Sequence, residues 1–113
     1  MTFIMNYSQG DIVLLPYPFT DLSAQKVRPA LIIGNTSSKY TDLFIVPLTS
    51  QIQNLQAGEF VLQHWKASGL NVTTAVKRGC VLIDTALIRM KIGILSDEDL
   101  ATAQKSLKFW VDL

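Results

Sequence analysis

The chain has few of the side chains on which most enzyme active sites are built. Its 113 residues include one cysteine, Cys80, and one histidine, His64. One cysteine cannot form an internal disulfide, which fits a reducing compartment and predicts a cytoplasmic protein. One histidine and one cysteine also cannot supply the usual ligand set of a transition metal. Because Cys80 lies in an apolar run, we expect it to be a small buried side chain.

Phosphate-binding loops and long apolar segments are also missing. The sequence has no glycine-rich phosphate loop and no dinucleotide fingerprint. No apolar stretch approaches the length that spans a membrane, and the first residues have neither a basic region nor a long apolar one. We therefore expect no membrane partner. Without repeats, linkers or low-complexity segments, residues 1–113 are expected to form a single domain.

The composition is that of a small, apolar globular domain. Apolar residues make up 49% of the chain and charged residues 17%. A domain this apolar often buries further surface in an oligomer. The formal net charge is only +1, but residues 61–91 carry five positive side chains and one negative one. This basic segment is either an ordinary solvated surface or a local contact for nucleic acid.

Two apolar runs near the start are predicted to form neighbouring strands. Asp11–Pro16 and Arg28–Gly34 are rich in Ile, Val and Leu and flank the polar stretch Tyr17–Val27. Pro16 and Pro18 lack a backbone donor, so the first strand should end there and lead into a loop. Arg28 should start the second strand, with Pro29 holding it in an extended conformation.

A third strand is predicted over Asp42–Thr49, nearly apolar throughout and therefore buried on both faces. Because Pro47 cannot donate to a neighbouring strand, we expect an end, a bulge or a sheet edge close to Leu48. His64–Thr74 reads as a loop, and Ile52–Ala57 as either a short helix or a loop. Shorter strands are predicted over Gly58–Gln63, Ala75–Arg78, Cys80–Asp84 and Lys91–Leu95, with a brief strand or turn over Ala86–Met90.

The last segment carries the clearest signals of a helix. Ser96 is a good N-cap, and the three acidic residues after it suit the positive end of a helix dipole. Asp99 takes the position of a variant capping box. The apolar residues Leu100, Ala103, Leu107 and Trp110 recur at helical spacing and predict a face that packs on the core. Many short strands before one helix predict a mainly β (α+β) fold, a small bent antiparallel sheet or barrel.

Five polar side chains are suited to hold a phosphate: Lys26, Arg28, Thr49, Ser50 and Gln51. A guanidinium can grip a phosphate through two parallel hydrogen bonds, and a threonine hydroxyl can donate to a developing oxyanion. By position alone, Arg28 could equally be an ordinary surface arginine.

His64 has no evident partner in the sequence and is expected at the surface or an interface. It is also the only side chain whose ordinary pKa suits general base work near neutral pH.

Taken together, the motifs of this chain resemble the MazF/PemK toxin endoribonucleases. The motifs that carry the resemblance follow the family's order over nearly the whole domain. They are Gly10-Asp11-Ile12-Val13, Pro16-x-Pro18-Phe19-Thr20-Asp21-Leu22, Lys26-x-Arg28-Pro29-Ala30-Leu31-Ile32, Pro47-Leu48-Thr49-Ser50-Gln51, Trp65-x-x-x-Gly69-Leu70, Ala75-Val76 and Ile92-Gly93-x-Leu95-Ser96.

The resemblance implies an SH3-like β-barrel with a C-terminal helix, a homodimer, and cleavage of single-stranded RNA without a metal or other cofactor. It also implies a cognate acidic antitoxin protein that occupies the RNA groove. The family's catalytic arginine and threonine fall on Arg28 and Thr49. Residues expected to bind RNA are Phe19, Thr20, Lys26, Ser50, Gln51, Lys77 and Arg78.

Two departures from the family pattern affect the expected activity. Many members carry a glutamate five residues before the arginine, where this chain has Ser23, with Asp21 as a possible substitute. Within Leu70–Val76 this chain also reads NVTTA, where relatives often have a Pro-Ser pair. The alternative to an active ribonuclease is therefore a non-catalytic barrel module, either a decayed toxin or an inhibitor of another enzyme by contact.

Overall fold

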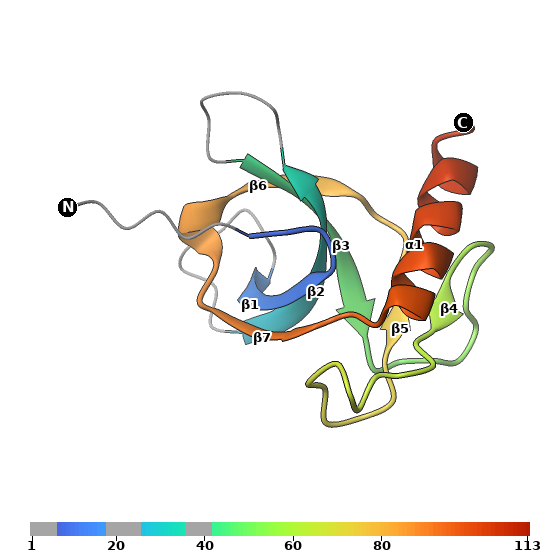
Figure 1. Cartoon of the computed structure of the whole chain (residues 1–113), viewed down its shortest axis with the longest axis horizontal. Helices are drawn as coiled ribbons and strands as arrows, with labels where there is room; N and C mark the ends of the chain where they lie inside the picture. The colour runs from blue at the N-terminus through green and yellow to red at the C-terminus, as the bar shows by residue number, and fades with distance from the viewer. Residues whose placement is uncertain (1–6, 18–25, 36–41) are drawn as a thin grey trace.

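Seven strands and one C-terminal helix make up the part of the chain described by the structure, a computed structural model covering residues 7–17, 26–35 and 42–113 (Figure 1). The strands are β1 (Asp11–Tyr17), β2 (Lys26–Asn35), β3 (Asp42–Thr49), β4 (Phe60–Val61), β5 (Ala75–Val76), β6 (Val81–Asp84) and β7 (Met90–Ile94). A short 3₁₀ helix, η1 (Thr85–Leu87), precedes β7, and the helix α1 spans Asp97–Trp110.

The strands form one strongly bent antiparallel sheet in the order β4-β5-β3-β2-β1-β7, with β6 also paired to β3. Figure 1 shows the strands curving around a common interior, with α1 lying beside β4 and β5. The predicted small SH3-like barrel with a terminal helix is therefore confirmed. Among the described strands the sheet stays open, because β7 pairs only with β1 and β4 only with β5.

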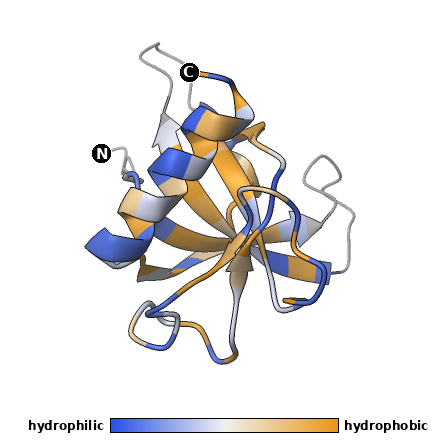
Figure 2. Cartoon of the chain, turned by 90° about the vertical axis from the view of Figure 1, so that its right-hand side faces the viewer, coloured by the Kyte–Doolittle hydropathy of each residue, from blue (hydrophilic) through white to orange (hydrophobic). Residues whose placement is uncertain are grey.

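The three central strands are buried on both faces because neighbouring side chains enter separate apolar clusters. Ile45 and Val46 of β3 illustrate this, since Ile45 packs on one side of the sheet and Val46 on the side covered by α1. Figure 2 shows α1 lying across these apolar strands. The prediction for β3 holds at its middle but fails at Phe44, which is 39% exposed. Phe44 pairs with Leu82 of β6, also exposed.

Some strand ends differ from the predictions because backbone pairing between strands continues beyond the apolar runs. The hairpin of β1 and β2 continues to the pair Tyr17–Lys26, so Arg28 is the third residue of β2 and not its first. Strands β4 and β5 have only two residues each, and η1 overlaps the start of Ala86–Met90, the stretch predicted as a brief strand or turn. The prediction of a buried Cys80 is wrong, because Cys80 is exposed in the bulging segment before β6.

Helix α1 begins as its cap residues predict. The Ser96 hydroxyl accepts a hydrogen bond from the Asp99 N–H at 3.1 Å, and Ala103 is buried in the core. The Asp99 carboxylate does not complete a capping box. It accepts hydrogen bonds from the Gln63 and His64 N–H groups, both at 2.9 Å, and is 1% exposed. This carboxylate therefore ties the residues after β4 to the first turn of α1. None of the described helices is long and apolar enough to cross a membrane.

Two glycines let the loop between β4 and β5 close onto β7. A Cβ atom on Gly93 would overlap the Ser68 carbonyl oxygen, and one on Gly69 would overlap the Ile92 carbonyl oxygen. Gly69 also has φ of +93°, a conformation that other residues rarely adopt. The contact places Leu70, which is buried, and Asn71 next to Ile92. The loop thereby contributes a wall to the cavity described below.

Candidate active site

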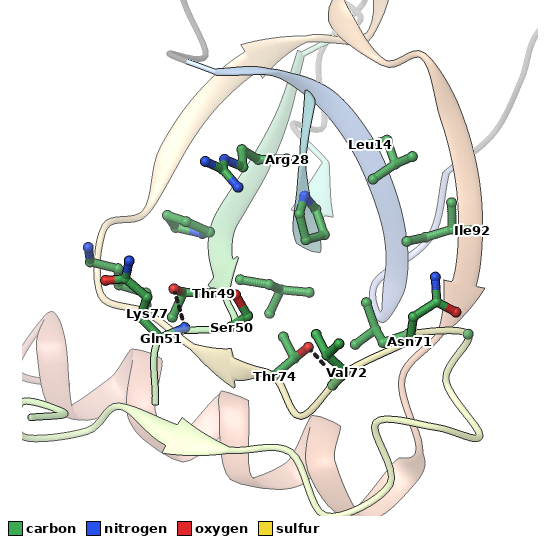
Figure 3. Close-up of a pocket in the computed structure, with 15 residues that line it drawn as sticks. Leu14, Arg28, Thr49, Ser50, Gln51, Asn71, Val72, Thr74, Lys77 and Ile92 are labelled. Atoms are coloured by element: carbon green, nitrogen blue, oxygen red, sulfur yellow. Dashed lines mark hydrogen bonds between the residues drawn. The ribbon is translucent and has the colours of Figure 1, made fainter. Parts of the chain in front are cut away.

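A cavity of about 540 Å³ opens beside the ends of β2 and β3 (Figure 3). One side of it is polar, where β2, β3 and the residue after β5 supply Arg28, Thr49 and Lys77. The opposite side is apolar, with Leu14 from β1 and Ile92 from β7. A space of this size with a few convergent polar groups is typical of a small-molecule or nucleotide site.

Arg28 brings a positive charge to this cavity. It lies opposite Leu15 in the β1–β2 pairing, and its side chain is exposed. Figure 3 shows the guanidinium above Thr49 and on the same side of the cavity as Lys77. Within residues 7–17, 26–35 and 42–113, neither of the two ion pairs engages Arg28. Its five N–H donors thus face the cavity and solvent, which suits a phosphate ligand.

Thr49 is the last residue of β3, and its hydroxyl has a fixed local partner. Its Oγ1 accepts a hydrogen bond from the Gln51 N–H at 3.0 Å (Figure 3). Accepting that bond leaves the hydroxyl proton of Thr49 to be donated elsewhere. The turn also exposes Ser50 and Gln51 at the mouth of the cavity. Thr49 can therefore serve as a donor for a negatively charged oxygen.

Lys77 lies at the same cavity because β3 pairs with both β5 and β6, and Lys77 lies between these two strands in the sequence. Strand β5 pairs with Leu48 and Thr49, and β6 pairs only up to Ile45. Residues 77–80 thus lie opposite only Val46 and Pro47, and the Lys77 N–H donates to the Pro47 carbonyl at 2.9 Å. This gap in the pairing confirms the interruption predicted near Leu48. Pro47 has no N–H to donate to the neighbouring strand.

A second cavity, of about 290 Å³, adjoins the first and shares Thr49, Gln51 and Lys77 with it. Its other lining residues are Gln53, Asn54, Leu55, Gln56, Glu59 and Arg78. Half of these six side chains are amides, which can both donate and accept hydrogen bonds. The second cavity therefore extends the Arg28–Thr49 cavity along a polar surface that ends in Arg78.

Among the residues that the structure describes, Glu59 is the one acidic side chain lining the second cavity. Its carboxylate accepts hydrogen bonds from the Gln56 N–H at 2.6 Å and from the Arg78 N–H at 2.8 Å. Burial opposes its ionisation, but these two bonds, with the charges of Lys77 and Arg78, outweigh that effect and lower its pKa below the ordinary value. Glu59 is therefore ionised at neutral pH.

The structure brings together most of the predicted site residues. Arg28, Thr49, Ser50, Gln51 and Lys77 line the first cavity, and Arg78 lines the second. Lys26 is exposed at the start of β2 and lines neither cavity. The predictions for Phe19 and Thr20, and the departure at Ser23, fall outside the described residues.

His64 lies away from both cavities, on the surface as predicted. Its Nε2 is 3.0 Å from a Glu98 carboxylate oxygen at the start of α1, and its side chain is 41% exposed. No histidine therefore lines either cavity formed by the described residues.

Sequence reasoning missed several lining residues because they come from loops. Asn71, Val72 and Thr74 belong to the segment predicted only as a loop, and Glu59 was assigned to a strand without a role. The positive φ of Asn54, +60°, marks the tight turn in the 50–59 loop. Gln51, Lys77 and Arg78 of the second cavity were predicted from the family motifs, and the run of amide residues in the 50–59 loop was the signal for its other residues.

Solved structures that share this fold include several toxins. The Mycobacterium tuberculosis toxin MazF-mt6 superposes with a TM-score of 0.72 at 21% identity, over 91% of this chain and 97% of that chain. A mycobacterial endoribonuclease in complex with its cognate antitoxin gives 0.76 at 15% identity, over 96% and 97%. The MazE–MazF structure from Deinococcus radiodurans gives 0.73 at 17% identity, over 95% and 96%. Identities this low establish a shared fold.

Comparison with curated protein sequences gives no significant match. A family model, in contrast, covers residues 8–111, nearly the whole chain. It describes the PemK-like, MazF-like toxin of type II toxin–antitoxin systems. The family resemblance found in the motifs is thereby confirmed, and this chain belongs to the PemK-like, MazF-like toxin family.

Proposed function

We propose that this protein is a toxin that cleaves single-stranded RNA without a metal ion. The observation that carries the proposal is that Arg28 and Thr49, 21 positions apart in the sequence, line one cavity together with Lys77. The cations can hold a phosphate, and the Thr49 hydroxyl can donate to one of its oxygens. Family membership and the endoribonucleases of the same fold support this assignment.

In the proposed reaction, the RNA supplies its own nucleophile. The 2′-hydroxyl oxygen attacks the neighbouring phosphorus and loses its proton, while the bond from phosphorus to the 5′-oxygen breaks and that oxygen gains a proton. The products are a 2′,3′-cyclic phosphate and a 5′-hydroxyl. Arg28 grips the scissile phosphate and offsets the charge that builds up on it. Thr49 donates to a non-bridging oxygen of that phosphate.

The role of Arg28 is electrostatic. Arginine is protonated throughout the physiological pH range and cannot act as a general base. Preorganised donors are effective because they do not reorganise when charge develops, and the loss of one typically costs about 10²–10³ in rate. The apolar side of the cavity, with Leu14 and Ile92, strengthens such interactions by limiting water around the phosphate.

We further propose that the protein acts as a homodimer inhibited by an acidic antitoxin. Large apolar side chains remain exposed at the end of α1, where Phe109 is 63% and Val111 56% exposed, which suits contact with another protein surface. Two of the structures that share the fold are complexes of a toxin with an antitoxin. An acidic segment would compete with RNA for Arg28, Lys77 and Arg78.

The test is expression of wild type and Arg28→Ala in a bacterial host, followed by cleavage assays with the purified proteins. Arg28→Ala should abolish toxicity and lower the cleavage rate about 10²–10³-fold, because it removes a preorganised donor. The fold should persist, since this side chain is exposed. Lys105→Ala removes the same charge from the exposed face of α1 and should cleave normally. Thr49→Ala should lose less, as Ser50 partly replaces its hydroxyl.

Other outcomes would refute the proposal. Folded Arg28→Ala that cuts RNA at the wild-type rate would remove the mechanism. Growth arrest by wild type with intact RNA would support the alternative, an inhibitor that acts by contact, and normal growth would indicate a decayed toxin.

A further inference from the structure

Glu59 places a negative charge where a ribonuclease should bind a polyanion. It lines the second cavity beside Lys77 and Arg78, and its lowered pKa keeps it ionised. Electrostatics alone would make this residue unfavourable for RNA binding, because it repels phosphate. The hydrogen bonds that its carboxylate accepts indicate a structural role instead.

Both carboxylate oxygens of Glu59 are used to join two separate segments. One accepts from the Gln56 N–H within the 50–59 loop, and the other accepts from the Arg78 N–H in the bulge after β5. The Glu59 N–H in turn donates to the Gln56 carbonyl at 2.9 Å, so the turn is closed in both directions. Glu59 therefore fixes the distance between the loop and the basic residues opposite it.

Helix α1 holds the same loop from the other side. The Trp110 indole N–H donates to the Ala57 carbonyl at 2.9 Å, and the Ser106 hydroxyl donates to the Gly58 carbonyl at 2.7 Å. Within the loop, the Gln56 side-chain amide donates to the Asn54 carbonyl at 3.1 Å. The loop is thus attached to α1 at residues 57 and 58, and Glu59 is its link to Arg78.

We propose that Glu59 is a positioning residue that builds the second cavity as a binding site for the nucleotide next to the scissile phosphate. This inference rests on the proposed ribonuclease function. The cavity of about 290 Å³ has room for a nucleobase, its amide side chains can pair with a base edge, and Lys77 and Arg78 can hold the adjoining phosphate. The carboxylate itself touches neither the base nor the reacting atoms.

The Glu59→Gln variant separates this role from simple electrostatics. If the charge of Glu59 were all that mattered, its removal would tighten RNA binding. If Glu59 positions the cavity, the variant should bind more weakly, because the amide NH₂ of glutamine cannot accept from a backbone N–H. The loss of one hydrogen bond of this kind predicts about tenfold weaker binding.

The experiment uses a synthetic RNA containing the sequence that wild type cuts in a long transcript, with a 2′-deoxy sugar at the cleavage position so that it binds without reacting. We expect a Kd about tenfold higher for Glu59→Gln, and, with the reactive RNA, a similarly raised KM and a kcat within about twofold of wild type. Glu98→Gln is the matched control: it makes the same charge change at an exposed site that lines neither cavity. It should bind RNA as wild type does.

Shortened RNAs locate the effect. Removal of nucleotides one at a time from either end should abolish the difference between wild type and Glu59→Gln once the nucleotide in the second cavity is gone. Hydrogen exchange provides a readout without RNA. The Gln56 and Arg78 amides should both be protected in wild type, and one of them should lose protection in Glu59→Gln, because glutamine keeps a single acceptor oxygen.

Binding by Glu59→Gln that equals or exceeds wild type would overturn this inference and leave the ribonuclease proposal intact. So would an unprotected Arg78 amide in wild type. A wild-type protein that neither binds nor cuts RNA would overturn both the Glu59 inference and the proposed ribonuclease function. Of the outcomes of these experiments, it is the one that contradicts the proposed function.

Discussion

Replacement of the buried Asp99 carboxylate should destabilise the domain strongly. Asp99 is 1% exposed and accepts hydrogen bonds from the Gln63 and His64 N–H groups. Asn has nearly the same size, but only its carbonyl oxygen accepts a hydrogen bond. In Asp99→Asn one N–H keeps a neutral acceptor, and the other faces the NH₂ of the amide in a place that water does not reach.

The magnitude follows from these contacts. A hydrogen bond to a charged group contributes about 1.5–3 kcal/mol, and a buried donor left without a partner costs about 1–3 kcal/mol. Loss of the charge near the start of α1 adds about 0.3–1 kcal/mol. Because these terms overlap, we expect Asp99→Asn to lower the free energy of unfolding by about 2–5 kcal/mol. Against the 5–15 kcal/mol typical of whole domains, this is a large loss.

The assay is urea unfolding followed by circular dichroism at one fixed protein concentration. Asp97→Asn is the matched control, because it removes the same charge from the first turn of α1 at an exposed position. It should cost only the dipole contribution, about 0.3–1 kcal/mol. If the two variants unfold within about 0.5 kcal/mol of each other, less than the predicted value of a single charged hydrogen bond, the reasoning about the buried carboxylate is refuted.

Three further predictions concern packing and partners. Gly93→Ala should lower stability by about 1–3 kcal/mol in thermal unfolding, because its Cβ would overlap the Ser68 carbonyl oxygen, whereas Gly34→Ala, with open space around it, should be nearly neutral; equal melting temperatures would contradict the close approach. Light scattering at micromolar concentration should give twice the monomer mass, with roughly 800 Å² buried per partner, and a stable monomer would exclude the proposed dimer. Saturating antitoxin should abolish RNA cleavage, and undiminished cleavage would show that it binds elsewhere.

Local signals in the sequence determined most of the elements. Apolar runs bounded by glycine, proline and polar residues located β1, β2 and β3 to within a few residues. Ser96 and the acidic residues after it located the start of α1, because an N-cap depends only on side chains within one turn. Pro47 predicted the interruption in pairing from a local property too, because proline has no backbone N–H to donate to the strand beside it. The family motifs pointed to Arg28 and Thr49.

The errors arose where partners distant in sequence decide the outcome. Cys80 was expected to be buried because it adjoins an apolar run, but the bulge opposite Pro47 leaves it exposed. Phe44 was expected to be buried because its strand is apolar, but nothing among the described residues covers it fully. Burial depends on what packs against a residue, and the residue's own hydropathy does not contain that information.

The tertiary structure alone decided how the site is assembled. The register of β3 against β5 sets Lys77 beside Thr49, and a shift of one residue would turn the side chains of β5 to the other face. Asp99 reaches backbone donors 35 and 36 positions away, and Glu59 reaches the Arg78 N–H 19 positions away. A carboxylate shows no sign in the sequence of which distant N–H groups it will accept from. That choice is made only when the loops are packed against the helix and the sheet.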